Sequence, residues 1–505
     1  MSLAVLRSRA LSGMDALCVS VEVHLACGLP SLTIVGLPDA EVRESKHRVQ
    51  AVLQNAGFQV PNRRITVNLA PADLPKESGR FDLPIALGIL AASGQIPIRE
   101  LDRFEFAGEL SLSGELRPVR GALAMTFAMQ RGAGARAFIL PAANADEAAL
   151  VSDAEIYPAS TFLQVCAHFT SRDGEGRLTR HQALVPGVPP VYPDLSDVKG
   201  QIAIKRALEV AAAGLHSFLL VGPPGAGKTM LASRFAGLLP PMNDEDALES
   251  AAVQSLTGHF NASQWKVRPF RSPHHTSSGI ALVGGGSVPR PGEVSLAHCG
   301  VLFLDELPEF DRRVLEVLRQ PMESGRVTIS RAARQADFPA RFQLIAAMNP
   351  CPCGYLGHPS GKCHCSGDVV QRYQDRISGP LLDRIDMLVE VSAMPPAAML
   401  ADADGDTSTV IAARALAAHE VQLARQGKPN VQLGTREIDR LCKPDRAGQQ
   451  LLHSAMLRFH WSARAYHRVL KVARTCADLE NRKTISKENV SEAIGYRRAL
   501  REPTP

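Results

Sequence analysis

The sequence predicts a multidomain α/β protein with a helical C-terminal domain, and three observations support this. The chain has 505 residues, which exceeds what one hydrophobic core accommodates and indicates two to four domains. Short apolar strands alternate with helices around a glycine-rich loop at residues 222–229. Beyond Ile411 the apolar residues follow a helical spacing to the end of the chain.

The N-terminal region, residues 1–171, is predicted to be a mixed α+β domain. Apolar residues alternate with polar ones over residues 19–25, as in a half-buried strand. Asp39 is the expected cap of a helix, and residues 82–92 are expected to form a mostly buried helix. Residues 104–119, with turn glycines at Gly108 and Gly114, predict a β-hairpin.

Two segments are typical of domain boundaries. Residues 172–198 are polar and then proline-rich (Pro186, Pro189, Pro190, Pro193), which predicts an exposed linker. Residues 394–409 are rich in Pro, Ala, Asp and Gly and form a second expected linker. The expected domains between and after them are an α/β core at 199–393 and a helical domain at 410–505.

Composition narrows the class of protein. Hydrophobic residues make up 45% and charged residues 21% of the chain, as in ordinary globular proteins. The apolar runs fall short of the ~20 residues that span a bilayer, and no signal peptide is recognised near Met1. We therefore expect a cytoplasmic protein with no membrane partner. The net charge of +5 permits nucleic-acid binding without arguing for it.

The glycine-rich loop predicts a nucleotide phosphate site. An apolar strand at 217–221 runs into G-x-x-x-x-G-K-T and then into a helix. This order lets backbone N–H groups and a helix N-terminus surround phosphates. Lys228 is expected on the β- and γ-phosphates and Thr229 on Mg²⁺. The expected binding residues are Gly222, Pro223, Pro224, Gly225, Ala226, Gly227, Lys228, Thr229 and Met230.

Two further strands are expected to bring polar groups to the same place. The apolar strand 301–304 ends in Asp305, expected to hold Mg²⁺, and Glu306, expected to polarise the attacking water. The strand 342–348 ends in Asn349, expected to orient water or the γ-phosphate, because ligands of parallel sheets lie at the strands' carboxyl ends. The alternatives are ordinary carboxylates at an exposed strand end and a turn asparagine before Pro350.

Four of the ten cysteines follow Asn349 within a short loop. Cys351, Cys353, Cys363 and Cys365 have the spacing C-x-C-x₉-C-x-C. Residues i and i+2 of an extended segment face the same way, so each pair can offer two thiolates to one metal. Four thiolates suit a tetrahedral structural Zn²⁺, and in a reducing compartment clustered cysteines favour metal over disulfide. His358 or His364 can substitute for one cysteine, and free thiols are the alternative.

Longer motifs carry a family resemblance. These motifs are the stretches 268–275, 284–286, 291–298 and 303–310, which occur together with the phosphate loop, the acidic strand end and Asn349. With them, the chain resembles the Mg-chelatase-like ComM/YifB family of bacterial AAA+ ATPases over essentially its whole length. The resemblance implies Walker A, Walker B and sensor 1 motifs, ATP and Mg²⁺ as cofactors, and a homo-hexameric ring. It also implies a DNA motor that drives branch migration during natural transformation.

The resemblance supplies three further assignments. Arg384 matches the arginine finger, which reaches the nucleotide of a neighbouring subunit; a surface salt bridge is the alternative. Arg464 matches sensor 2 of the helical lid, with Arg468 as the alternative. The N-terminal domain resembles the ribosomal-protein-S5 and Lon-protease-like fold. The stretch that matches the Lon catalytic serine, residues 80–87, has no serine, and Arg120 replaces the lysine, so proteolysis is not expected.

Basic residues indicate where DNA would be held. Arg326, Arg331 and Arg334 belong to an expected hairpin at 326–340, and Arg268, Arg271, His274 and His275 lie in an insertion before the acidic strand. Such residues can follow phosphates without reading bases, on single-stranded, branched or D-loop DNA. The alternatives are a solvated basic loop, a chelatase-type motor that remodels a protein partner, and a nucleotide-gated scaffold that does not hydrolyse.

Overall fold

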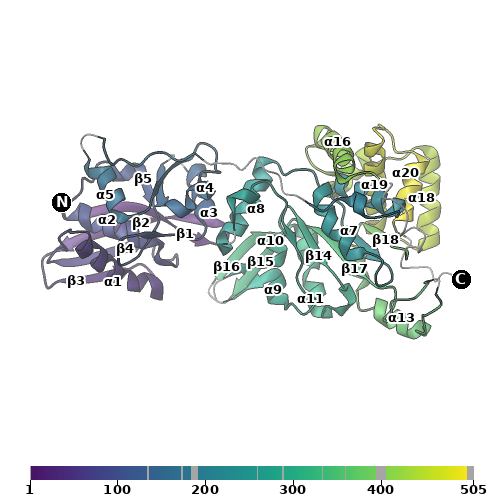
Figure 1. Ribbon diagram of the computed structural model, residues 1–505, viewed down its shortest axis with the longest axis horizontal. Helices are drawn as coiled ribbons and strands as arrows, with labels where there is room; N and C mark the ends of the chain where they lie inside the picture. The colour runs from purple at the N-terminus through teal and green to yellow at the C-terminus, as the bar shows by residue number, and fades with distance from the viewer. Residues whose placement is uncertain are drawn as a thin grey trace.

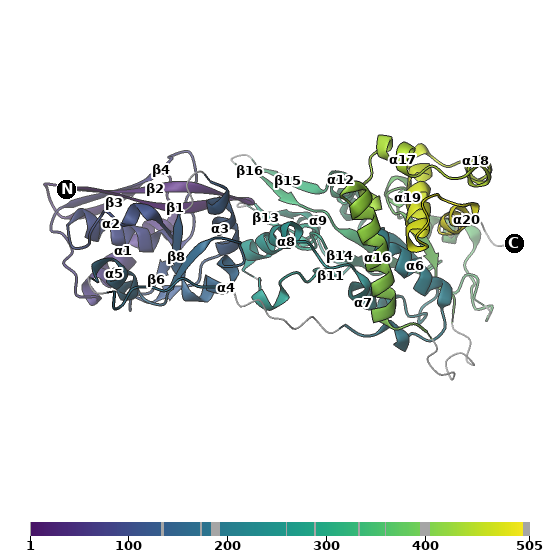
Figure 2. The ribbon, with the colours of Figure 1, turned by 90° about the horizontal axis from the view of Figure 1, so that it is seen from above.

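The computed structural model describes residues 2–132, 136–171, 174–182, 192–258, 260–286, 289–331, 334–358, 360–393 and 405–497. The molecule is elongated and consists of three successive bodies, with the first and the last of them at opposite ends (Figure 1). An N-terminal body of sheets and helices is followed by a central body around a parallel sheet and then by a helical C-terminal body (Figures 1 and 2).

The first sheet of the N-terminal body is a four-stranded one with the order β1-β2-β4-β3. Its valines at 19, 21 and 23 are fully buried, as the alternation predicted. Asp39 caps the first helix by accepting a hydrogen bond from the Val42 N–H at 2.8 Å, which confirms the expected cap. All residues of α2 are buried. The elements are β1 (Leu3–Ser12), β2 (Asp15–Ala26), β3 (Ser31–Val35), β4 (Arg64–Ala70), α1 (Ala40–Asn55) and α2 (Asp82–Ala92).

A second, parallel sheet completes the N-terminal body and corrects one prediction. β5 pairs in parallel with β8 and not within a hairpin at 104–119; the hairpin is confined to β6 and β7. The reason is burial: Glu105 is buried in β5 and pairs with Arg9 at 2.6 Å, which fixes this strand inside the body. The elements are β5 (Phe104–Phe106), β6 (Glu109–Leu110), β7 (Leu116–Arg117), β8 (Ala137–Pro141), β9 (Glu155–Ala159), α3 (Ala122–Arg131), α4 (Ala145–Ala148) and α5 (Phe162–Thr170).

The central body is built on a five-stranded parallel sheet with the order β11-β14-β17-β10-β18. Three of its strands, β10, β14 and β17, are buried along their whole length. Because the strands are parallel, their carboxyl ends meet at one edge of the sheet. The elements are β10 (Phe218–Val221), β11 (Phe270–Arg271), β14 (Val301–Leu304), β17 (Gln343–Met348), β18 (Met387–Glu390), α6 (Ile202–Gly214), α7 (Lys228–Phe235) and α8 (Asp244–Thr257).

Smaller elements surround this sheet. The expected hairpin is present as β15 and β16, which pair in antiparallel register from Arg326 opposite Pro339 to Arg331 opposite Arg334. The remaining elements of the central body are α9 (Gly279–Val283), β12 (Gly284–Gly285), β13 (Arg290–Pro291), α10 (Glu293–Leu296), α11 (Arg312–Val317), α12 (Arg319–Ser324), β15 (Arg326–Arg331), β16 (Arg334–Pro339), α13 (Gly367–Gln374) and α14 (Gly379–Leu382).

Residues 405–497 are described without a gap and contain helices but no strand, as predicted. α6 of the central body packs against α16 and α19, so the helical body shares one hydrophobic core with the parallel sheet. No helix within the described ranges combines the length and apolar character needed to cross a bilayer. The helices are α16 (Ser408–Gln426), α17 (Thr435–Leu441), α18 (Arg446–Phe459), α19 (Ala463–Leu479) and α20 (Lys487–Gly495).

The segments expected to be linkers are only partly described. Pro186, Pro189 and Pro190 and residues 394–404 lie outside the described residues. At the end of the first segment, Leu195 and Val198 are buried in the core of the central body, which differs from the exposed linker expected there. These two residues anchor the chain where it enters the parallel sheet.

The N-terminal body lies against one side of the central body. α3 packs beside α8, and both views place them together (Figures 1 and 2). The turn between β1 and β2 also approaches the hairpin: a Cβ added to Gly13 would lie 3.1 Å from the Cβ of Ala336 in β16. Across the contact the Ser255 hydroxyl donates to the carboxylate of Glu147. The hairpin β15–β16 is therefore held from the side of the N-terminal body.

Candidate nucleotide and metal site

The phosphate loop connects β10 to α7 at the carboxyl edge of the sheet. Gly225 and Gly227 have φ values of 76° and 85°, which residues with a Cβ adopt only at a cost. A Cβ on Gly222 would lie 2.2 Å from the Val391 carbonyl oxygen of the neighbouring strand end, so only glycine fits there. The loop therefore turns tightly and brings backbone N–H groups to the start of α7.

Lys228 lies at the centre of this loop and is nearly buried. Its Nζ donates hydrogen bonds to the carbonyl oxygens of Gly222 at 2.7 Å and Pro223 at 2.9 Å, and to Asn349 Oδ1 at 3.0 Å. Burial lowers the pKa of Lys228, while Asp305 and Glu306 act in the opposite direction. The bond to Asn349 joins the phosphate loop to the end of β17.

Thr229 and Asp305 are brought together from α7 and the end of β14. The Thr229 hydroxyl donates to Asp305 Oδ2 at 2.6 Å. A hydroxyl and a carboxylate are the hard oxygen ligands that Mg²⁺ prefers, and Mg²⁺ keeps several waters besides one or two protein ligands. The donor set at this point therefore fits the ion that the sequence predicts.

Glu306 has a contact that the sequence did not reveal. Its backbone is in the left-handed region, with φ of 51°, and its side chain is 57% exposed. Nδ1 of His275, from the segment after β11, lies 3.3 Å from Glu306 Oε2, and the rings of His274 and His275 lie 4.1 Å apart. The sequence places His275 among basic residues suited to phosphates. The adjacency of β11 and β14 brings it to Glu306 instead.

The four cysteines form one cluster. Their sulfur atoms all lie within 4.8 Å of one another. Cys351 Sγ is 3.3 Å from Cys353 Sγ and 3.8 Å from Cys363 Sγ, and Cys353 and Cys363 are 3.6 Å apart. Tetrahedral zinc with bonds of about 2.3 Å places its sulfurs about 3.8 Å apart. Both the all-sulfur donor set and the spacing therefore fit a zinc ion.

Hydrogen bonds within the loop favour a thiolate at one of these cysteines. The backbone N–H of Tyr355 and the thiol of Cys351 lower the pKa of Cys353 to about 6. His358, a possible substitute ligand, is instead bonded through Nδ1 to the Ser360 hydroxyl at 2.7 Å. The cysteine loop also contacts the phosphate loop, because a Cβ on Gly354 would lie 2.6 Å from Cδ of Pro224.

The two arginines assigned by resemblance share one acidic partner. Arg384 Nη2 lies 2.6 Å and Arg464 Nη2 3.4 Å from Glu323 Oε1. The side chain of Arg384 is 5% exposed, and that of Arg464 is 63% exposed. Arg468, the alternative for sensor 2, pairs instead with the buried Asp386.

The expected DNA-contacting residues lie in two places. Arg326, Arg331 and Arg334 are in the two strands of the hairpin, and the side chains of Arg331 and Arg334 lie outside the described part of the structure. Arg271 forms two bonds with Glu293, at 2.7 and 2.8 Å. Arg268 donates to the carbonyl oxygens of Pro240 and Cys299, so it serves the fold of the insertion.

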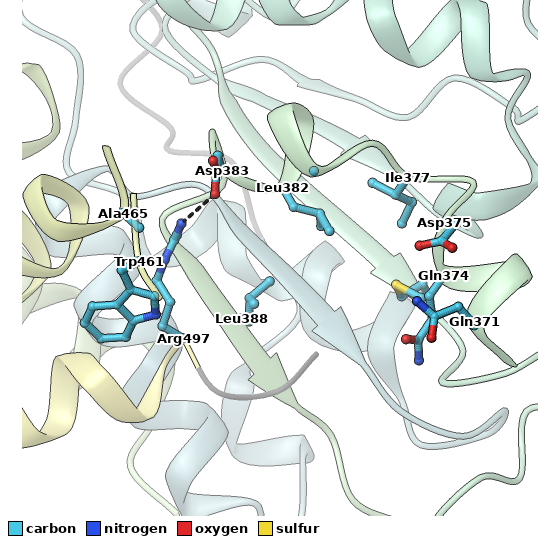
Figure 3. A pocket seen from close by; sticks show the side chains of 12 residues that line it. Gln371, Gln374, Asp375, Ile377, Leu382, Asp383, Leu388, Trp461, Ala465 and Arg497 are labelled. Atoms are coloured by element: carbon cyan, nitrogen blue, oxygen red, sulfur yellow. Dashed lines mark ion pairs between the residues drawn. The ribbon is translucent and has the colours of Figure 1, made fainter. Parts of the chain in front are cut away.

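A cavity of about 270 Å³ lies between the central and helical bodies (Figure 3). Met348 at the end of β17, Gln371 and Gln374 of α13, and Trp461 before α19 are among its lining residues. Arg497 points toward Asp383 across it, at 3.6 Å. Its lining includes no residue of the phosphate loop, so the cavity borders the end of β17 on the side of the helical body.

Comparison with known proteins identifies the family. Residues 194–399 match the family described as magnesium chelatase, subunit ChlI, and residues 405–497 match its C-terminal region. Residues 21–144 match the family described as subunit ChlI of Mg-chelatase. The chain is 49% identical to the competence protein ComM of Haemophilus influenzae, over 99% of this chain and 98% of that protein. The chain belongs to the ComM/YifB family.

Other relatives agree with this placement. The YifB protein of Salmonella typhimurium is 47% identical over 98% of this chain and 97% of its own length. The magnesium-chelatase 38 kDa subunit of Cereibacter sphaeroides is 28% identical, over 31% of this chain and 52% of that subunit. The ComM/YifB chain is thus an AAA+ ATPase with Mg-chelatase-like domains, mixed α/β architecture, a parallel sheet and a helical C-terminus.

Proposed function

We propose that this chain is a ring-forming AAA+ ATPase that couples ATP hydrolysis to movement along DNA. In this proposal it acts as a cytoplasmic branch-migration helicase in natural transformation and homologous recombination. The observation that carries it is the meeting of three strand ends at one sheet edge. There, Lys228 is bonded to Asn349, and Thr229 is bonded to Asp305.

Each of these groups has a role in hydrolysis. Lys228 exchanges its carbonyl partners for the β- and γ-phosphates of ATP, and Asn349 orients the γ-phosphate or the water. Thr229 and Asp305 hold Mg²⁺, which neutralises charge on the phosphates when it is bound. Glu306 accepts a hydrogen bond from the attacking water and polarises it, once its carboxylate turns from His275.

Assembly into a homo-hexamer completes the site. Arg384 reaches the nucleotide of a neighbouring subunit as the arginine finger, and Arg464 acts as sensor 2. Arg468 forms an ion pair with Asp386, which supports Arg464 as sensor 2. The N-terminal body, with its proposed S5 and Lon-like fold, serves as a scaffold or DNA platform beside the hairpin.

DNA is the proposed substrate of the movement. Arg326, Arg331 and Arg334 of the hairpin would contact phosphates of single-stranded, branched or D-loop DNA, which requires no base readout. Arg271 belongs to the same proposal, although Glu293 holds it in the free subunit. The similarity to a protein named for competence supports a role in natural transformation. Zn²⁺ at Cys351, Cys353, Cys363 and Cys365 is proposed as structural, holding the loop after Asn349 in place.

One other function has an observation in its favour. The likeness to magnesium-chelatase subunits supports a motor that remodels a protein partner and does not act on DNA. The two proposals differ in what stimulates hydrolysis. A DNA motor accelerates hydrolysis when forked DNA is present, whereas a protein remodeller does not respond to it.

The deciding measurement is the ATPase rate with and without forked DNA. We expect stimulation, and we expect Arg331→Ala plus Arg334→Ala to leave the basal rate nearly intact. The hairpin variant should bind DNA more weakly and with a flatter salt dependence, because fewer counterions are released. The slope of the logarithm of the binding constant against the logarithm of the salt concentration becomes less negative by about 0.7–0.9 for each DNA phosphate that the variant leaves unneutralised. A matched control is Arg312→Ala plus Arg313→Ala in the neighbouring α11. A rate indifferent to DNA would favour the protein remodeller.

A further inference from the structure

Glu323 lies between the arginine pair and the hairpin. It belongs to α12, and β15 begins three residues later at Arg326. Its Oε1 lies 2.6 Å from Arg384 Nη2 and 3.4 Å from Arg464 Nη2. One carboxylate thus contacts both arginines that the proposed function sends to a nucleotide.

In the free subunit Arg384 is not placed to reach a neighbour. Its side chain is 5% exposed, and Nη1 donates to the Pro380 carbonyl oxygen at 2.7 Å. Its Nε is buried without a hydrogen-bond partner in the described part of the chain. A buried donor left without a partner is unfavourable, which lowers the free-energy cost for Arg384 to leave this position. To reach the nucleotide of another subunit, Arg384 has to leave this position.

The hairpin is attached firmly to the helix that carries Glu323. The Ser324 hydroxyl accepts from the Arg326 N–H at 3.2 Å and donates to the Arg326 carbonyl at 2.9 Å. The Gly325 carbonyl oxygen accepts a hydrogen bond at 2.8 Å from the backbone N–H of Ala340, the residue that follows β16. Both ends of the hairpin are therefore bonded to the residues directly after Glu323, and a displacement of the hairpin moves this carboxylate.

We infer that Glu323 is a positioning residue that retains Arg384 and Arg464 in the free subunit and releases them when the hairpin engages DNA. The inference rests on the proposed function. Glu323 is 44% exposed, and an ion pair with such a partner is weak enough to be exchanged. A nucleotide phosphate offers the guanidinium a stronger, bidentate partner. DNA on the hairpin would thereby raise hydrolysis in the ring.

The test uses Glu323→Gln in the full chain, which removes the charge but keeps the size. Basal kcat should rise about two- to five-fold, the factor that a partly exposed ion pair can contribute. The rate with forked DNA should stay at the wild-type value, so the stimulation ratio falls by the same factor. The fall in this ratio separates release of the arginines from a structural effect, which would change the basal and the DNA-stimulated rates together. Glu323→Ala should behave in the same way.

Two controls separate this role from a structural one. Glu316→Gln removes an acid of the same surface that pairs with Arg319 at 2.5 Å, and it should match wild type. Glu323→Gln combined with Arg384→Ala should not show the rise in basal rate, because the released arginine is absent. If wild type is not stimulated by DNA, the proposed function and this inference both fall. If wild type is stimulated and Glu323→Gln equals Glu316→Gln, the inference alone is overturned.

Discussion

At the scale of single residues, the proposed role of Lys228 is to bind ATP, and that of Glu306 is to promote its hydrolysis. The Lys228 ammonium is held by oxygens of its own chain at the position where phosphate oxygens would replace them. Lys228→Ala should therefore weaken ATP binding, whereas Glu306→Gln should bind ATP and slow hydrolysis by about 10²–10⁴-fold, the usual effect of removing a general base. Titration with a fluorescent ATP analogue and a phosphate-release assay measure the two effects separately.

The control for this pair is Lys266→Ala, which removes a surface lysine that pairs with Asp244. It should change neither binding nor turnover. Near wild-type hydrolysis in Lys228→Ala or Glu306→Gln would contradict the roles given to them.

The sequence predicts the positions of some residues at the sheet edge and not those of others. Asp305 and Asn349 directly follow buried apolar strands, and Lys228 follows the loop after a third; parallel strands bring such residues together. The sequence therefore predicted the neighbours that the structure shows. The contact of His275 with Glu306 was not predictable, because it depends on β11 lying beside β14. The shared partner Glu323 likewise requires the positions of α12, α14 and α19 to be known together.

At the scale of elements, the cysteine loop is placed to support the phosphate loop. Gly354 approaches Pro224 so closely that a side chain there would collide with it. Cys351→Ser plus Cys353→Ser should remove the one zinc expected per chain, because two remaining thiolates cannot close a tetrahedral site. It should also weaken ATP binding through the contact with Pro224. Elemental analysis of the purified protein and nucleotide titration measure these effects.

A matched control is Cys18→Ser plus Cys27→Ser, which changes two exposed cysteines of the N-terminal body. This variant should keep the metal. Wild-type protein that contains no zinc and has all four loop thiols open to titration would rule the metal out.

The elements also show where local sequence patterns mislead. Residues 83–92 are apolar on every side and, with Asp82, form the buried helix expected of them. Residues 104–119 have the glycines of a hairpin, yet β5 pairs with β8, which begins at Ala137. Turn residues report local geometry, whereas all three residues of β5 are buried and Glu105 pairs with Arg9 from a distant strand. Such a long-range ion pair leaves no local signal in the sequence.

At the scale of the whole molecule, contacts form a continuous path from the N-terminal body to Arg384 in the central body. The β1–β2 turn contacts the hairpin, the hairpin is bonded to α12, and Glu323 of α12 contacts Arg384. In the proposed function the end of this path serves another subunit, since an arginine finger acts at a neighbour's nucleotide. The proposal therefore requires a ring of identical chains, and the activity should belong to interfaces between subunits.

Mixing two inactive variants tests this requirement. Arg384→Ala alone should lower hydrolysis by about 10³–10⁵-fold, as removal of an arginine finger does, and Lys228→Ala should weaken nucleotide binding in its own subunit. In a mixed ring, some interfaces join an intact Lys228 site to an intact Arg384 of the neighbour. Partial ATPase should therefore return on mixing, and it should follow the fraction of such interfaces as the ratio of the two variants is varied. Co-purification of an untagged variant with an affinity-tagged one establishes that the subunits co-assemble. Mixing Lys228→Ala with Glu306→Gln is the matched control, because both variants damage the same half of the interface. Co-assembled rings that stay inactive at every ratio would show that Arg384 does not act on a neighbouring subunit.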